Sequence, residues 1–587
     1  MKVLIGCLIL SLASTAVADA DSDAFDTLTQ TYLNDVGTLS PVAATQTGDH
    51  TYDHLLDDVS DTARNATLDA LLGYRAALAD IDRESLSPAL QVDYELLSNQ
   101  VEFDIWTLGE LEPWAWNPMY YVSISGNSIY TLVARNFAPL EERLNNAAAR
   151  MQQMPRFFEQ ARASLVPERV PKVYAETAVK QNRGLVSIIK YMIEPELGSV
   201  SAATRDNVLA SIDIAKAAVE EHQAWLENEL LPRASAEFRV GASVYDRKLA
   251  FALNSDLGRK EIRARAESEY ERVRNEMYEI SKGVYKELHP YTAFPDRPDE
   301  AYKQTIIRAA LEQAYQNLPP EDGIVDLARK QLAAATAFVI ERNLVTMPQE
   351  PVEIIVMPEF RRGFSFAYLD PPGPLDSDQP AFYAVSPLPS AWNKTQIRSF
   401  LREYNVYSME DLTIHEGVPG HYLQLALSNR YPSTLRAVLY SGSFVEGWAV
   451  YAEQFMIEEG YLDYDPLMRL INLKWYLRAI TNAIIDSAIH VDGMTEDEAM
   501  HLMIEGGFQE EREAAGKWTR AQLSFGQLST YFVGYQEHIE LRADVEAAWD
   551  DEFTLRRYHD QVLSYGSPPV RFVRALMFGD AIPRSVK

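Results

Sequence analysis

The chain has 587 residues, of which 85 are acidic and 54 basic, so its formal net charge at pH 7 is −31. A surface this acidic repels nucleic acid and anionic membranes, which excludes nucleic-acid binding as a general role. If acidic residues also line the functional cleft, that cleft would favour cationic peptides. A chain of this length can bury a core without disulfides, and Cys7 is its only cysteine.

The first 18 residues have the features of a secretory signal peptide. Lys2 precedes an apolar run over residues 3–13, and Ala16-Val17-Ala18 is a small-x-small cleavage site. The run is shorter than the ~20 residues that a membrane-spanning helix needs. Cleavage after Ala18 would release a soluble periplasmic or secreted protein with no integral membrane segment. As an alternative, the residues up to Cys7 (Leu-Ile-Gly-Cys) resemble the sequence at which bacterial lipoproteins are cleaved and lipidated.

Residues 19–587 are expected to form a mainly α, large multi-helix and two-lobed fold. Residues 19–343 make up its N-terminal helical part. The clearest pattern covers residues 258–288, where apolar side chains recur at three- and four-residue steps among charged neighbours. Residues 205–230 and 298–318 have the same pattern. We expect all three helices to be scaffold.

A small antiparallel β-sheet is predicted within residues 344–390. Three short runs rich in β-branched and aromatic residues, at 352–357, 364–369 and 381–385, are separated by Pro- and Gly-rich turns. The edge of such a sheet can hold an extended peptide as an added strand. The loop 371–380 would either overhang the cleft or form a plain surface turn.

A candidate metal site lies in the remaining part, residues 391–587. There His415 and Glu416 are followed by His421 and, 25 residues later, by Glu446. Neutral imidazoles and a carboxylate suit zinc, and three protein ligands leave its fourth position open for water. Zinc lowers the pKa of such a water from about 15.7 toward about 7, and Glu416 would then act as general base. These residues predict a hydrolase with one zinc ion.

The spacing of the two histidines requires a break in the helix. In the motif H-E-x-x-H the histidines lie four apart on one helical face, whereas His415 and His421 are six apart. On an ideal helix their side chains would point about 120° apart. Pro419 and Gly420 can interrupt the helix, and we predict that this break brings His421 back toward His415. The alternative is a partly buried helix histidine, a helix that ends at Pro419-Gly420, and His421 as the cap of the next helix.

The residues around the motif predict where its helices begin and end. Ser408 with Asp411 resembles a capping box, so the helix of His415 should begin near Ser408. A second helix should run over residues 443–459 and stop at Gly460. A third should begin at Pro466 and end near residue 490.

Two motifs resemble a known family. Residues 415–424 read His-Glu-Gly-x-Pro-Gly-His-x-x-Gln, and residues 446–453 read Glu-Gly-Trp-Ala-x-Tyr-x-Glu. Both are similar to motifs of the bacterial domain-of-unknown-function family 885, which is grouped with the thermolysin-like zinc metallopeptidases. The resemblance implies a mostly helical metallopeptidase-like fold. It also implies that His415, His421 and Glu446 are zinc ligands and that Glu416 is the catalytic base.

Glu453 lies seven residues after Glu446 and therefore on the same face of the predicted helix. It would either orient a ligand histidine through a hydrogen bond or remain a solvated acid.

A zinc peptidase also needs a donor for the oxyanion that forms at the attacked carbonyl, a contact worth about 3 kcal/mol. His490, oriented by Asp486 four residues before it, and Tyr531 are the candidates. Each lies in a segment similar to a late segment of the family, although Phe525 stands where the family pattern has proline. The alternative for both is a core residue. Arg520 would either bind a substrate carboxylate, which would indicate a carboxypeptidase, or form a surface salt bridge.

Together these observations predict a zinc metallopeptidase of the bacterial envelope, an exopeptidase or oligopeptidase that cleaves short peptides. Glu416 would activate water and pass its proton to the leaving amine. One alternative is a zinc amidohydrolase with a non-peptide substrate. The other is a catalytically inactive binding protein, against which the intact set of ligands and base argues.

Overall fold

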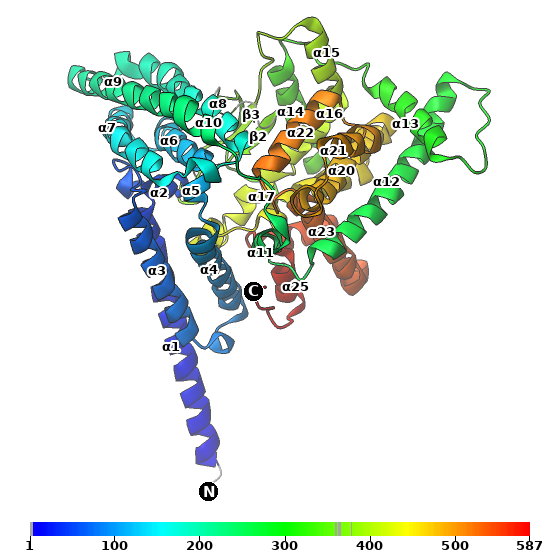
Figure 1. Cartoon of the computed structure of the whole chain (residues 1–587). Helices are drawn as coiled ribbons and strands as arrows, with labels where there is room; N and C mark the ends of the chain where they lie inside the picture. Colours follow the sequence, from blue (N-terminus) through cyan, green and yellow to red (C-terminus); the bar gives the residue numbers. More distant parts are fainter. Residues whose placement is uncertain (1–3, 359–360, 362–365, 377, 587) are drawn as a thin grey trace.

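The computed structural model describes residues 4–358, 361, 366–376 and 378–586, with side chains from Ala20 onward. Figure 1 shows the N-terminal helices gathered on one side of the molecule and α11 to α25 with the sheet on the other. The predicted mainly helical fold is confirmed. Among the described residues, none of the helices combines the length and the apolarity that a bilayer crossing requires.

The helices of the N-terminal side are α1 (Leu4–Leu39), α2 (Pro41–Thr47), α3 (Asp61–Asp80), α4 (Pro88–Trp106), α5 (Pro113–Trp116), α6 (Pro118–Val133), α7 (Leu140–Ser164), α8 (Lys172–Ile188), α9 (Ala202–Trp225) and α10 (Leu231–Arg233). Those of the other side are α11 (Gly241–Leu253), α12 (Arg259–Leu288), α13 (Glu300–Ala314), α14 (Ile324–Arg342), α15 (Lys394–Glu403), α16 (Val406–Glu416), α17 (His421–Ser428), α18 (Thr434–Val438), α19 (Gly442–Glu458), α20 (Pro466–Ser487), α21 (Glu496–His501), α22 (Glu511–Leu523), α23 (Ser529–Trp549), α24 (Leu555–Leu563) and α25 (Val570–Phe578).

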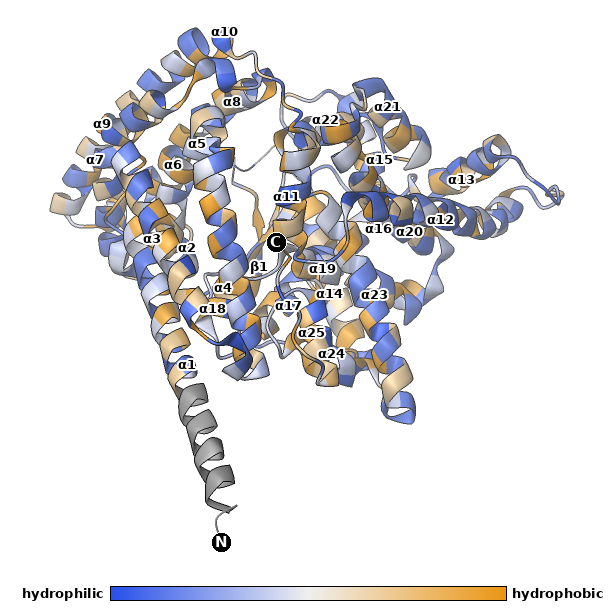
Figure 2. Ribbon diagram, turned by 60° about the horizontal axis from the view of Figure 1, so that its bottom comes forward, coloured by the Kyte–Doolittle hydropathy of each residue, from blue (hydrophilic) through white to orange (hydrophobic). Residues whose placement is uncertain are grey.

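The helices bury their apolar faces in two main cores. Figure 2 shows hydrophilic and hydrophobic residues side by side along α3 and α4, as expected for helices with one buried face. One core lies among α6 to α9, and the larger one among α12, α13, α19, α20 and α23. Trp448, Tyr451 and Phe455 of α19 are fully buried in the larger core. Helix α19 is therefore a central element of its side of the molecule.

The sheet has three strands, β1 (Val352–Val356), β2 (Ala367–Asp370) and β3 (Ala381–Val385), in the order β1-β3-β2. Strand β2 pairs with β3 antiparallel, but β1 pairs with β3 parallel. The sheet is thus mixed, and the prediction of an antiparallel sheet was wrong for β1. Part of the predicted strand 364–369 lies outside the described residues, and β2 occupies its end. Strand β2 forms one edge of the sheet.

Most helix predictions agree with the structure to within a few residues. The pattern over residues 258–288 corresponds to α12, and that over 298–318 to α13, whose N-cap is Asp299. The pattern over residues 205–230 covers α9 and a π-helical turn that follows it. The helix predicted to begin at Pro466 is α20, which continues as a π-helical turn over Ala488–Asp492.

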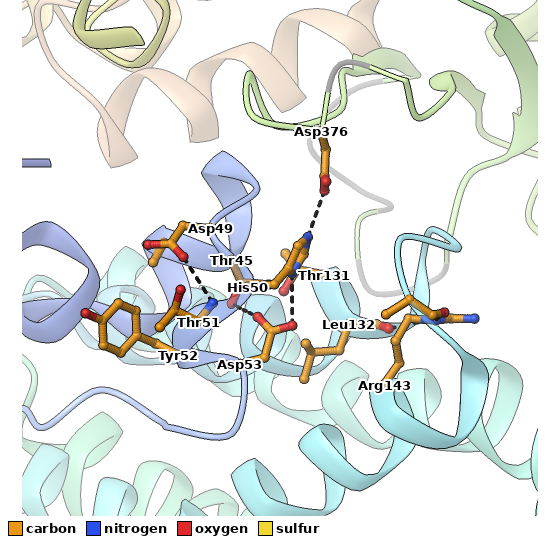
Figure 3. A network of polar contacts seen from close by, with 12 residues as sticks. Thr45, Asp49, His50, Thr51, Tyr52, Asp53, Thr131, Leu132, Arg143 and Asp376 are labelled. Carbon is orange, nitrogen blue, oxygen red and sulfur yellow. Dashed lines mark hydrogen bonds and ion pairs between the residues drawn. The ribbon is translucent and has the colours of Figure 1, made fainter. Parts of the chain in front are cut away.

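The loop predicted over residues 371–380 contacts the N-terminal side of the molecule through Asp376. Figure 3 shows His50 between Asp53 and Asp376: its Nδ1 lies 2.9 Å from a carboxylate oxygen of Asp53, and its Nε2 lies 2.9 Å from one of Asp376. The imidazole also stacks on Phe137, with ring centroids 3.6 Å apart. Burial alone would lower the pKa of His50, but the hydrogen bonds to both carboxylates raise it to about 9.

We predict that this attachment stabilises the fold in a pH-dependent way. Because the folded-state pKa is raised from 6.5 to about 9, the stabilisation is complete below pH 6.5 and is lost as the pH rises through 9. At pH 6 the parent should exceed His50→Gln in free energy of unfolding by on the order of 1 to 3 kcal/mol, and at pH 10 by almost nothing. Urea unfolding at a series of pH values measures this difference. A difference that does not change with pH would contradict the prediction.

Candidate metal centre

His415 and His421 lie on two consecutive helices. Helix α16 ends at Glu416, and α17 begins at His421 after the turn 417–420, in which the Val418–Pro419 peptide bond is cis. The helix is therefore broken between the histidines, as predicted. The break begins at Gly417, two residues before Pro419.

The start of α16 differs from the prediction. Its N-cap is Asn405, whose side-chain oxygen accepts hydrogen bonds from two backbone N–H groups, including that of Ser408. Asp411, the predicted capping partner of Ser408, is buried and accepts a hydrogen bond from Asn472 at 3.3 Å. An asparagine three residues earlier thus caps the helix in place of the serine.

The turn folds the chain back onto the end of α16. The N–H of Gly420 donates to the carbonyl of Ile414 at 3.0 Å, and a Cβ at Gly420 would lie only 2.0 Å from the carbonyl oxygen of His415. Only glycine fits at this point. Trp448 of α19 donates its indole N–H to the carbonyl of Pro419 at 2.9 Å, which joins the turn to the helix that carries Glu446.

His415, His421 and Glu446 converge on one point. The Nε2 atoms of the two histidines lie 3.7 and 3.5 Å from one carboxylate oxygen of Glu446, and the three ligand atoms all lie within 4.8 Å of one another. Three ligands of a tetrahedral zinc ion, each about 2.0–2.1 Å from the metal, would lie roughly 3.3 Å apart. These side chains could therefore hold one metal ion after small movements.

Glu453 orients His415 and is not a solvated acid. It is buried, and its Oε1 lies 2.5 Å from Nδ1 of His415, which leaves Nε2 to face Glu446. Burial alone would lower the pKa of His415, but Glu446 and Glu453 raise it well above its usual value. For Glu446 the signs are reversed. Burial alone would raise its pKa, but the two imidazoles lower it overall. A carboxylate behind a ligand histidine is a common support of metal sites.

Glu416 reaches from the last turn of α16 to the edge of the sheet. Its Oε2 accepts a hydrogen bond from the backbone N–H of Leu369 in β2 at 2.8 Å. Its neighbours in the cavity wall include both histidines and Glu446. The hydrogen bond to β2 fixes this carboxylate in the wall of the cavity that the histidines and Glu446 also line.

Tyr531 and Arg520 lie in the same cavity wall. The Tyr531 oxygen accepts a hydrogen bond from Arg520 at 3.1 Å, so Arg520 does not form a surface salt bridge. Helices α19 and α23 cross in backbone contact at Gly447 and Gly534, where a Cβ on Gly534 would lie 1.9 Å from the carbonyl oxygen of Ser443. This contact places Tyr531 of α23 near Glu446 of α19.

The structure does not bring His490 and Asp486 into the cavity. His490 points its Nε2 at the carbonyl oxygens of Ala521 and Ser524, at 2.7 and 3.1 Å, beyond the cavity wall. Asp486 was expected to orient His490. Its oxygens instead accept hydrogen bonds from the backbone N–H groups of Gly526 and Ser529. Both side chains therefore make their hydrogen bonds to the backbone from the end of α22 to the start of α23 and not to each other.

The cavity beside the site has a volume of about 430 Å³ and carries two cations that the sequence reasoning missed. Arg478 of α20 and Lys517 of α22 line it together with Arg520. Lys517 and Arg520 lie three residues apart and therefore on one helical face, and this spacing could have indicated a shared cationic surface. This wall of the cavity therefore does not meet the condition under which the cleft would favour cationic peptides.

A second cavity of about 600 Å³ shares Leu369, His421 and Glu446 with the first. Pro371, Pro372 and Pro374 line this second cavity, so the first part of the predicted loop 371–380 borders the cleft. Ser377 of that loop lies outside the described residues.

The chain matches the family model described as bacterial protein of unknown function (DUF885) over residues 41–577. A protein described as a putative lipoprotein of unknown function from Shewanella oneidensis is 33% identical, with a TM-score of 0.78 over 94% of this chain and 99% of that one. A putative lipoprotein from Colwellia psychrerythraea has the same fold, at 19% identity and a TM-score of 0.76 over 95% and 99% of the two chains. A comparison with curated proteins finds no match.

We predict that binding of a divalent metal ion at this centre releases a proton. The raised pKa of His415 means that a proton competes with the metal for the imidazole, so the apparent affinity should rise about tenfold per pH unit near pH 7. Calorimetric titration in two buffers of different ionisation enthalpy measures the released proton. Glu453→Gln should release less of it, since one of the two carboxylates that raise the pKa is gone, and Glu446→Gln should bind the metal much more weakly. An affinity independent of pH between 6 and 8 would argue against His415 as a ligand.

Proposed function

We propose that this chain, which belongs to the bacterial family DUF885, is a zinc-dependent hydrolase that cleaves short peptides. The convergence of His415, His421 and Glu446 beside the carboxylate of Glu416 carries the proposal. Two imidazoles and one carboxylate are the donor set of many catalytic zinc sites, which keep one position open for the reaction. The hydrogen bond between Glu453 and His415 gives the centre the support that such sites have.

In the proposed mechanism the side chains around the centre move protons and stabilise charge. When bound, zinc would activate a water and polarise the substrate carbonyl. Glu416, held by the N–H of Leu369, would take a proton from the attacking water and pass it to the leaving nitrogen. Because Arg520 can only donate, the Tyr531 oxygen accepts that hydrogen bond and keeps its own proton for the developing oxyanion.

The two cavities favour a peptide over a compact amide as substrate. They meet at Leu369, His421 and Glu446, so space is available on both sides of the metal centre. A chain that passes through both would place an internal or near-terminal amide beside Glu416. A non-peptide zinc amidohydrolase and an inactive binding protein are the alternatives that the experiment below separates.

We predict that Glu416→Gln abolishes peptide cleavage without loss of the metal. A mixed peptide library would be incubated with the zinc-loaded protein and its fragments identified by mass spectrometry. Loss of a general base should lower the rate about 100- to 10,000-fold. Glu511→Gln, on an exposed position of α22, serves as the matched control and should cleave like the parent.

If Glu416→Gln still cleaves peptides at the parent's rate, Glu416 is not the general base. No cleavage by the parent, with the metal bound, would favour a non-peptide substrate or a binding role.

We also infer an extracytoplasmic location. The signal-like start supports it, and the two relatives are described as putative lipoproteins. Cleavage after Ala18 predicts that the protein purified from its native envelope begins at Asp19, which intact-mass analysis measures. A lipid-modified N-terminus at Cys7, removed by Cys7→Ser, would establish the alternative.

A further inference from the structure

Three cations face the first cavity from one wall. Arg478 comes from α20, and Lys517 and Arg520 come from α22. Arg478 pairs with Glu513, and Arg520 donates to Tyr531 and Gln527, at 3.1 Å each. Among the residues that the structure describes, Lys517 has neither a hydrogen-bond acceptor nor an ion-pair partner, although it is only 4% exposed.

The charges of this wall do not balance. Glu513, one turn before Lys517 on α22, already accepts hydrogen bonds from Arg478 and Tyr404. Two further carboxylates border a neighbouring cavity that the same three cations line, and they pair with Lys474 and Arg402: Glu403 and Glu510. Nη1 of Arg478 is buried and has no partner among the described residues. Burial first, and then the charges of Arg478 and Arg520, lower the pKa of Lys517 well below its usual value. The carboxylates of Glu513 and Glu446 oppose this shift only in part. A buried ammonium group without a partner is destabilising, and an anion from outside the chain would favour its charged form.

The wall is built rigidly. His490 donates from Nε2 to the carbonyls of Ala521 and Ser524, at the end of α22, and so holds the helix that carries Lys517 and Arg520. Asp486 fixes the turn before α23, since it accepts hydrogen bonds from the N–H groups of Gly526 and Ser529. His490 and Asp486 are positioning residues of this wall.

We propose that Arg478, Lys517 and Arg520 form a binding site for a carboxylate of the substrate, close to the bond that is cleaved. The proposal rests on the proposed function, because it names the substrate class of the same cleft. A carboxylate would pair with the Lys517 ammonium and with the guanidinium groups on either side of it. Its source is either the free C-terminus of a peptide or the side chain of an aspartate or glutamate.

The second cavity extends the substrate description. Leu96, Phe103 and Phe251 are among the apolar side chains that line it. It shares only Leu369, His421 and Glu446 with the first cavity. A substrate that occupies both would carry apolar residues on one side of the metal centre and a carboxylate on the other.

The test measures binding without turnover. Zinc-loaded Glu416→Gln is mixed with N-acetylated tripeptides, supplied once as free acids and once as C-terminal amides, and bound peptides are identified by affinity-selection mass spectrometry. If the free C-terminus is the source of the carboxylate, the acids should bind at least tenfold tighter than the amides. Among the amides, those with aspartate or glutamate should bind best if the side chain is the source of the carboxylate, and in that case acids and amides of the same acidic sequence bind alike.

Lys517→Met in the same background should remove the preference for carboxylate-bearing peptides. Arg512→Met is the matched control, because Arg512 is exposed on the same helix and does not line this cavity. It lines the neighbouring cavity, which Arg478, Lys517 and Arg520 also border, so the control removes a cation next to the site but outside it. Peptides that bind without regard to their carboxylates, or no binding of any peptide, would overturn the proposal. Peptide cleavage by the parent is measured separately. Cleavage without a carboxylate preference would uphold the proposed function and overturn the carboxylate site, and carboxylate-dependent binding without cleavage would do the opposite.

The melting temperature of the ligand-free protein separates binding from a structural role. Lys517→Met removes an unpartnered buried charge and should raise the melting temperature while it weakens carboxylate binding. A lower melting temperature together with unchanged carboxylate preference would show that Lys517 supports the fold and does not bind the substrate.

Discussion

The backbone contact at Gly420 is the constraint on which the candidate metal centre depends. Two histidines six residues apart cannot face one metal from a single helix. The turn 417–420 solves this by folding directly against the last carbonyls of α16, at a distance that leaves no room for a side chain. The indole of Trp448 then joins the turn to α19. The same turn that pairs the histidines therefore also sets the position of Glu446 relative to them.

A second close contact joins this centre to the opposite wall of the cleft. Gly447 follows Glu446 directly, and it meets Gly534 of α23 with the two backbones in contact. Tyr531 lies one turn before Gly534, so the crossing sets its distance from the metal ligands. Asp486 holds the start of α23 because it accepts hydrogen bonds from the backbone N–H groups of Gly526 and Ser529. The side chains proposed as ligands, base and hydroxyl donor thus depend on helix packing, which suits a preorganised site.

Local patterns predicted the parts of the site that depend on neighbouring residues. The cluster of His415, His421 and Glu446 and the break between the histidines follow from residue types and spacing within one segment. Other features depend on residues distant in sequence. Strand β1 pairs with β3 in parallel and not with β2, its neighbour in sequence, and the alternation within each strand encodes neither the partner nor the direction.

The limit of local patterns also explains why the predicted interaction that would orient His490 through Asp486 differs from the hydrogen bonds that the structure shows. Their four-residue spacing indicated a hydrogen bond along one helix, but each side chain finds its hydrogen-bond partners in backbone groups more than 30 residues away. Net charge also says little about one wall of a cleft. Although the chain carries a charge of −31, the cavity beside the metal centre has three cations on one wall.

The measurement that tests the central claim most directly is anomalous X-ray diffraction at the zinc absorption edge from crystals of the zinc-loaded protein. The account predicts one strong peak about 2.0–2.2 Å from Nε2 of His415, Nε2 of His421 and a carboxylate oxygen of Glu446. A peak at another site, or none at these three atoms at full zinc loading, would contradict it.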